Sequence, residues 1–425
     1  MLAHEWRQRR RRAESTCHRF AQLWQWDERI QAYIEAFALL GHEGSERAHD
    51  RLQAPISEGE LFALSSQALI ARNRSLAQAC IGMVQAMPGF LEAFCSALDW
   101  VDWPGVEFAL GLWPAEDSLR QAAVLHSIAS HDLVVDSAQI ASWISRLSHA
   151  PAVQHGALRC ALLTGQADWA VRAFDLADAA SPPELRLAAV EALIVFSEDA
   201  VRRDALRLLR ELALGSGRVA AVATRELMTL GGIEASQLLE ALAAEPTRVR
   251  QQIAAMGWSG QLAHLPGLAD LLDDPTHGRA AGAAITMLTG SDPPEDGWAS
   301  NLAAPRAASE PLSDRMPDHI PPADPDAELP QPDRAQFAVW WNATRARYAL
   351  DERYLAGRPR SAEHLTTVLR QGRLAHRPQA SWLLQVARRG QGLAHLAPAP
   401  RQLAQINQIT QPAQISEPKE ALHHG

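Results

Sequence analysis

The chain has 425 residues, of which 47% are hydrophobic and 21% charged, and its formal net charge is −9 at pH 7. This composition is ordinary for a folded protein, and the length allows two or three domains or one extended helical array. The acidic balance argues against nucleic acid as a partner, because phosphate binding requires a basic surface.

Charge is also unevenly distributed along the chain. By count, about ten acids and two arginines lie in residues 291–333, whereas about thirteen bases and five acids lie in residues 334–425. We therefore expect an acidic linker that folds back electrostatically on a basic C-terminal region or on the rest of the protein.

The N-terminus resembles neither a secretion signal nor a membrane anchor. Arg9 to Arg12 are followed by Glu14 without an apolar core, and no later run reaches about 18 apolar residues. We expect a cytoplasmic protein that does not cross a membrane. The four cysteines, Cys17, Cys80, Cys95 and Cys160, form no CxxC pair, which favours reduced structural thiols.

Residues 1–57 are predicted to form an N-terminal helical region. Leu23, Trp26, Ile30, Ile34 and Phe37 recur at helical spacing and make one apolar face. Such a region would form an N-terminal cap on the helices that follow it.

A turn signal returns roughly every 26 to 37 residues between residues 58 and 290, about the length of one helix-turn-helix repeat. The signals are Pro88-Gly89, Pro114-Ala115, Pro151-Ala152, Pro182-Pro183, Gly215-Ser216-Gly217, Pro246-Thr247 and Pro275-Thr276. Between them apolar residues keep a period near 3.6, as in residues 183–196 and 201–212. Because one helix pair cannot cover two apolar stripes, neighbouring pairs must stack. The segment 58–290 is thus predicted to be a HEAT-like α-solenoid.

Three C-terminal segments follow from composition. Residues 291–333 are rich in Pro, Asp, Ala and Ser and are predicted to be an acidic linker, ordered in part. Residues 334–397 are predicted to form a small helical module, with Ser361 as the N-cap of one helix. Residues 398–425 are rich in Gln and Pro and are predicted to be a disordered tail.

Several motifs resemble one family. They are Asp324 to Asp333, Trp340-Trp341, Arg353 to Pro359, Leu365 with Val368 to Gly372, Ala284 to Asp292, and Trp26 to Ile30. Together they resemble a family of uncharacterised bacterial HEAT-repeat proteins encoded near type VI secretion cargo genes. The chain departs from that family after Arg377, where Pro378 and Trp382 fall in what is elsewhere an alanine-rich helix. The resemblance implies no catalytic residues.

The sequence contains no complete copy of the common enzyme motifs. The only lysine is Lys419, which removes a Walker A loop, a kinase lysine and a Schiff-base lysine together. Gly257-Trp258-Ser259-Gly260 approaches a nucleophile elbow but lacks the final glycine, and it lies in a predicted turn between helices. His126, His131, Asp132 and Asp136 could be drawn as a metal cluster, although one polar helix end explains them equally well. We therefore expect no catalytic residues, cofactor or metal.

Thirteen tryptophans are a large number for this chain. They either fill gaps between stacked helices or form a recognition surface for a partner protein. The candidate protein-binding residues are Trp103, Trp113, Trp143, Trp169, Trp258, Trp340 and Trp341. A third interpretation places Trp100 with Asp99 and Asp102 in a groove that excises damaged bases, which the acidic repeats argue against.

The sequence therefore predicts an all-α protein: a HEAT-like α-solenoid with an N-terminal helical cap and a small helical C-terminal module. We expect a non-enzymatic scaffold whose concave surface, lined by the second helices of successive repeats, holds a partner protein. The resemblance implies a role as adaptor, loading chaperone or accessory factor for type VI secretion cargo, with a cargo or spike component as partner. The alternatives are an immunity protein that caps a toxic cargo domain and a HEAT-like nucleic-acid enzyme.

Overall fold

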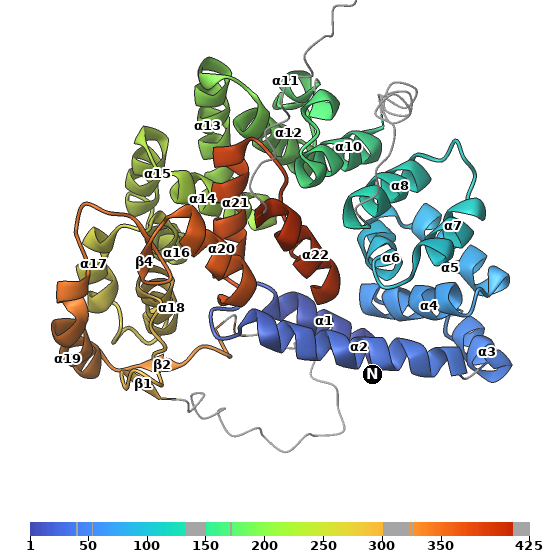
Figure 1. Ribbon diagram of the computed structural model, residues 1–425, viewed down its shortest axis with the longest axis horizontal. Helices are drawn as coiled ribbons and strands as arrows, with labels where there is room; N and C mark the ends of the chain where they lie inside the picture. Colours follow the sequence, from blue (N-terminus) through green and yellow to red (C-terminus); the bar gives the residue numbers. More distant parts are fainter. Residues whose placement is uncertain are drawn as a thin grey trace, which may run out of the picture.

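The computed structural model describes residues 1–39, 41–52, 54–131, 150–170, 172–300, 324 and 326–410 (Figure 1). The described part is 71% helical and contains 21 α-helices, which confirms the prediction of an all-α protein. Two antiparallel pairs of two-residue strands complete it: β1 (Ala299–Ser300) with β2 (Gln331–Pro332), and β3 (Tyr354–Leu355) with β4 (Arg358–Pro359). None of the described helices is long and apolar enough to span a membrane.

The helices follow one another along the chain with short connections. The first half comprises α1 (Leu2–Arg12), α2 (Phe20–Leu39), α3 (Gly41–Leu52), α4 (Glu58–Ile70), α5 (Arg74–Ala86), α6 (Leu91–Leu98), α7 (Trp103–Gly111), α8 (Ser118–Ser130) and α10 (Pro151–Thr164). The second half comprises α11 (Ala173–Leu176), α12 (Pro183–Phe196), α13 (Asp199–Ala213), α14 (Gly217–Leu230), α15 (Ile233–Ala243), α16 (Val249–Ser259), α17 (Leu265–Asp270), α18 (Gly278–Thr289), α19 (Arg334–Thr344), α20 (Ala362–Gln371), α21 (His376–Arg388) and α22 (Ala399–Thr410).

Short 3₁₀ turns lead into or follow several of these helices. They are η1 (Pro88–Phe90), η2 (Ala167–Ala170), η3 (Pro246–Arg248), η4 (Leu262–His264) and η5 (Arg345–Arg347).

Local signals in the sequence set many helix ends. Side-chain oxygens of Asn73, Asp102 and Ser361 accept hydrogen bonds from backbone N–H groups in the first turns of α5, α7 and α20. At the other end, Gly165 and Gly260 adopt left-handed conformations after α10 and α16, which glycine does without steric cost.

Most of the helices form two layers. In the inner layer, α4, α6, α8, α10, α12, α14, α16 and α18 pack each against the next. The partners α13, α15 and α17 lie at the periphery of the molecule (Figure 1). The predicted pair 183–196 and 201–212 is present as α12 and α13, which bury the expected apolar stripes. Packing between sequence neighbours is the arrangement that the repeat period predicted.

The C-terminal helices occupy the middle of the molecule. Helix α21 packs against α12 and α14, and α22 packs against α2, so these helices lie between the inner layer and the N-terminus (Figure 1). Helix α2 buries Leu23, Trp26, Ile30 and Ile34, as predicted. The helices that contact α21 are the first members of their pairs. The expectation that second helices line a concave binding surface stays a prediction.

One predicted boundary also requires correction. Residues 399–410, expected in a disordered tail, form α22, because Ile406 and Ile409 find apolar neighbours and Gln402 and Gln405 find buried hydrogen-bond partners. In the predicted linker, residues 291–300 and 326–333 are ordered, and Trp298 is fully buried. Residues 301–323 and 411–425 lie outside the described part.

Candidate functional site

The predicted tryptophans of the helical array do not share one surface. Trp113 is 3% exposed and packs edge-on against Phe94 in the core. Trp103 is half-buried, and its indole N–H donates to Glu107 at 2.9 Å. Trp258 is half-buried against the core of the array. Trp143 lies outside the described residues, and for Trp169, in η2, only the backbone is described. The gap-filling interpretation fits Trp113 directly.

Trp340 and Trp341 belong to a continuous row of aromatic rings. The row runs Trp298, Phe337, Trp340, Trp341, Tyr348, Tyr354, with neighbouring ring centroids 5.3 to 6.2 Å apart. The buried ends, Trp298 and Tyr354, hold the row against α18, whereas Trp340, Trp341 and Tyr348 are half-buried. Because the rings at both ends of the row are buried, the half-buried rings between them are held in a defined orientation.

Close to these rings in the sequence, two aliphatic side chains are exposed. Val339 on α19 is 67% exposed and Leu350, after η5, is 78% exposed. We define Val339, Trp340, Trp341, Tyr348 and Leu350 as the α19 surface. Helix α19 lies at the edge of the molecule beside α17 (Figure 1). An apolar surface with fixed aromatic rings is typical of a protein-binding site.

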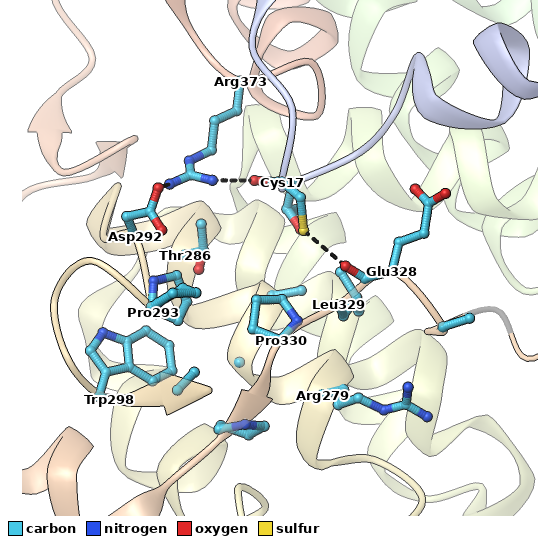
Figure 2. A pocket seen from close by; sticks show the side chains of 17 residues that line it. Cys17, Arg279, Thr286, Asp292, Pro293, Trp298, Glu328, Leu329, Pro330 and Arg373 are labelled. Atoms are coloured by element: carbon cyan, nitrogen blue, oxygen red, sulfur yellow. Dashed lines mark hydrogen bonds and ion pairs between the residues drawn. The ribbon is translucent and has the colours of Figure 1, made fainter. Parts of the chain in front are cut away.

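A cleft of about 260 Å³ lies between the α1–α2 connection, α18 and the ordered ends of the acidic segment. Figure 2 shows Cys17 on one side of the cleft, Trp298 and Pro293 on another, and Pro330 between them. Residues from segments far apart in the sequence meet here: parts of 284–292 and of 324–333 line the cleft together with Arg373.

The charged groups of the cleft are already paired. Arg373 donates to Thr16 O at 2.6 Å and to the Asp292 carboxylate at 2.7 Å. Arg279 donates to the Asp324 carboxylate at 2.6 Å. Burial raises the pKa of the Cys17 thiol, so it is a poor nucleophile at neutral pH. The cleft thus joins three segments, and its geometry supports a structural role rather than chemistry.

Three buried carboxyl groups, those of Asp99, Glu191 and Glu226, lie on the inner layer with partly exposed His126 and Arg159. His126 Nε2 is 2.9 Å from Oδ1 of the buried Asp99, and Arg159 Nη1 donates to Glu191 at 2.8 Å. Glu226 is buried beside Glu191; burial first and the charge of Glu191 second raise its pKa well above the ordinary value. The sequence analysis named His126 and Asp99 in two different candidate sites, but it missed Arg159, Glu191 and Glu226, since their only signal was polar residues on apolar helices.

The residues that the sequence analysis considered as a nucleophile or as metal ligands make structural hydrogen bonds. The Ser259 hydroxyl donates to Met256 O at 2.7 Å and accepts from Gln261 N at 3.0 Å, so it belongs to a helix end. His131 Nε2 is 3.0 Å from the carbonyl oxygen of Leu98. Asp132 and Asp136 lie outside the described residues. Where the structure describes the chain, no group of three or more His, Cys, Asp or Glu is placed to hold a metal ion.

The alternative site around Trp100 is also used structurally. Trp100 is 9% exposed and lies in the N-terminal core, with the Arg9 guanidinium 5.8 Å from its ring centroid. Asp102 accepts a hydrogen bond at the start of α7.

Comparisons with protein families, with curated proteins and with solved structures found no match to this chain.

Proposed function

We propose that the protein is a non-enzymatic, HEAT-like α-solenoid that binds a partner protein. It would act as an adaptor, loading chaperone or accessory factor for type VI secretion cargo. The packing of the helices supports the proposal of a HEAT-like array, because each inner helix packs against the next inner helix along the chain, as is typical of repeat proteins. The assignment to type VI secretion rests on the family resemblance alone.

The observation that carries the binding function is the α19 surface. Its half-buried Trp340 and Trp341 are held in place by stacking, so a partner would lose little side-chain entropy on contacting them. Tryptophan and tyrosine often dominate interface energies. Val339 and Leu350, close to these rings in the sequence, add exposed apolar side chains to this part of the molecule. The partner is therefore expected to present an apolar surface to α19.

Affinity capture from native cells with mass spectrometry tests this function. The tagged wild-type chain is compared with Val339→Glu/Leu350→Glu, which charges the α19 surface, and with Phe174→Glu as a matched control. Phe174 is 69% exposed on α11, far from α19 in the sequence. We expect wild type and control to recover a secretion cargo or spike component in stoichiometric amount, and the double variant to lose it without a change in melting temperature.

Other results would favour the alternatives. Recovery of nothing above background in crosslinked cells contradicts the adaptor function. A cargo that is toxic when expressed alone, and harmless with this protein, indicates an immunity protein. Salt-sensitive DNA binding would indicate a nucleic-acid enzyme.

A further inference from the structure

Helix α19 lies at the edge of the molecule and is covered on little of its surface (Figure 1). Of its eleven residues, Arg334–Thr344, only Phe337 is buried. Trp340 and Trp341 are half-buried, and Val339 is 67% exposed. Large apolar side chains that stay accessible on one helix are typical of a surface that a partner covers.

Two arginines follow this helix directly in the chain. Arg345 and Arg347 belong to η5, the turn after α19, and both are exposed. Tyr348 comes next: its N–H donates to the carbonyl oxygen of Arg345 at 3.1 Å, and its ring centroid lies 5.4 Å from that of Trp341. The turn thus places both arginines next to Tyr348, a member of the α19 surface.

Neither arginine has an acidic partner. In the part of the chain that the structure describes, the side chains of Arg345 and Arg347 make no ion pair and no hydrogen bond. Arg334, at the start of the same helix, differs: its guanidinium lies 2.5 Å from the carboxylate of Asp270. The positive charges at the C-terminal end of α19 are therefore not neutralised by a direct contact.

Arg353 adds a third unpaired guanidinium. It precedes Tyr354, the last ring of the aromatic row, and its Nη1 is buried without a hydrogen-bond partner among the described residues. Burial lowers the pKa of Arg353, whereas a nearby carboxylate would raise it. Between residues 345 and 360 five arginines stand against Asp351 and Glu352, a net charge of +3, although the whole chain carries −9. The aromatic row thus ends in a locally basic part of an acidic protein.

Charge and apolar character together restrict the partner. Positive charges at the edge of an apolar surface attract carboxylates and repel basic segments, and they act on the association rate and its salt dependence. Single-stranded nucleic acid can also stack on aromatic rings beside arginines. The exposed aliphatic side chains of Val339 and Leu350 favour a protein, because they offer no ring on which a base could stack.

We propose that the α19 surface, together with Arg345 and Arg347, binds an acidic segment of the partner protein in which aspartate or glutamate side chains lie beside apolar ones. The apolar side chains of this segment contact Trp340 and Trp341, and its carboxylates pair with the two arginines. This inference rests on the proposed binding function and specifies the chemistry of its partner.

Two fluorescein-labelled peptides test this preference directly. One has leucine on one face and glutamate on the other, and the second has lysine in place of every glutamate. Fluorescence anisotropy should show that the glutamate peptide binds the full chain at least about tenfold tighter than the lysine peptide. Raising the salt concentration from about 0.05 M to about 0.5 M should weaken its binding at least about threefold, because salt screens exposed charges. Equal binding of the two peptides would overturn the proposal.

Charge reversal locates the contact. In Arg345→Glu/Arg347→Glu the preference for the glutamate peptide should vanish or reverse, without a change in melting temperature, because both residues are exposed. The matched control, Arg74→Glu/Arg203→Glu, makes the same charge change at exposed residues of α5 and α13 and should bind like wild type. An equal loss in both variants would contradict the assignment to α19. If the reversed variant does not fold, Arg345→Gln/Arg347→Gln provides the same comparison.

Crosslinking of the natural partner separates this inference from the proposed function. A photo-crosslinking amino acid replaces Val339 or Ala346, both exposed, and mass spectrometry identifies the partner segment that it joins. An acidic segment with apolar residues supports the inference. A captured partner that crosslinks through a basic segment, or at neither position, leaves the binding function intact and overturns the inference. Peptide preference without any captured partner supports the charge chemistry of the surface and contradicts the adaptor function.

Two other occupants of the surface would also overturn the inference. A labelled oligothymidylate that binds tighter than the glutamate peptide would assign the surface to single-stranded nucleic acid. A wild-type chain that sediments as a dimer, with Val339→Glu/Leu350→Glu sedimenting as a monomer, would assign it to a second copy of the chain.

Discussion

Arg250 on α16 donates hydrogen bonds to both carboxylate oxygens of Asp326, which lies 76 residues further along the chain. The Asp326 side chain is 4% exposed and that of Arg250 is 47% exposed. The carbonyl oxygen of Asp326 also accepts from Arg279 of α18 at 2.9 Å. One buried aspartate therefore fixes the end of the acidic segment to two inner helices and places Glu328 and Pro330 in the cleft.

Asp326→Ala should lower the free energy of unfolding by about 2–3 kcal/mol. Removing one member of a buried ion pair costs about 3–5 kcal/mol, and the partial exposure of Arg250 reduces that loss. Urea unfolding followed by circular dichroism measures it. The control is Asp270→Ala, which breaks an exposed pair with Arg334 and should change stability by less than about 1 kcal/mol. Equal effects in the two variants would contradict the anchoring role.

The His126–Asp99 pair should make stability depend on pH. Burial lowers the pKa of His126, but the nearby Asp99 carboxylate outweighs burial and raises it above the ordinary 6.5. A raised histidine pKa contributes stability that is complete below the unfolded pKa and is lost as the pH rises through the folded pKa. His126→Gln should therefore destabilise the protein more at pH 5.5 than at pH 9.

The difference should be about 0.5–1 kcal/mol, because His126 is 39% exposed and solvent weakens the pair. Urea titrations of wild type and His126→Gln at both pH values measure it. The same loss at pH 5.5 and at pH 9 would show that the histidine acts through packing alone.

Glu226→Gln should stabilise the protein above neutral pH. Burial and the charge of Glu191 raise the pKa of Glu226 well above 4.5, so the folded chain keeps a proton that the unfolded chain releases. Stability of the wild type must then fall as the pH rises above the unfolded pKa, whereas glutamine has no proton to lose.

At pH 8 the gain should be at least about 1 kcal/mol, since one unit of pKa shift corresponds to about 1.4 kcal/mol. At pH 4 the gain should vanish. Melting curves at the two pH values are the measurement, with Glu198→Gln as an exposed control. A variant that is less stable than wild type at pH 8 would mean that Glu226 is ionised in the folded state.

The sequence predicted local structure better than it predicted which parts meet. Periodicity identified α12 and α13, and Ser361 was correctly expected to cap α20, because these features depend on neighbours within a few residues. Helix α22 was missed because its buried Gln402 and Gln405 resemble a polar tail until their distant partners are known.

The same limit applies to the candidate sites. Both helices of a pair carry an apolar stripe, so one repeat cannot reveal which helix faces inward. The inner layer was identified only by its contacts with α21. Trp340 and Trp341 were among the predicted binding residues, but their row of rings depends on Trp298, which the sequence analysis placed in a linker. Contacts between residues far apart in the chain leave little trace in a single sequence.

Gly290→Ala should destabilise the protein by at least about 2 kcal/mol. Gly290 ends α18 with φ +67°, where an L-residue loses about 1–2 kcal/mol, and an added Cβ would clash with the carbonyl oxygen of Ala356 between β3 and β4. Gly82→Ala is the control: it lies in α5 with no atom within 4 Å of its added Cβ, so alanine should stabilise it by about 0.5–1 kcal/mol. Differential scanning calorimetry should therefore shift the two melting temperatures in opposite directions. An unchanged melting temperature for Gly290→Ala would mean that the hairpin of β3 and β4 does not press against the end of α18.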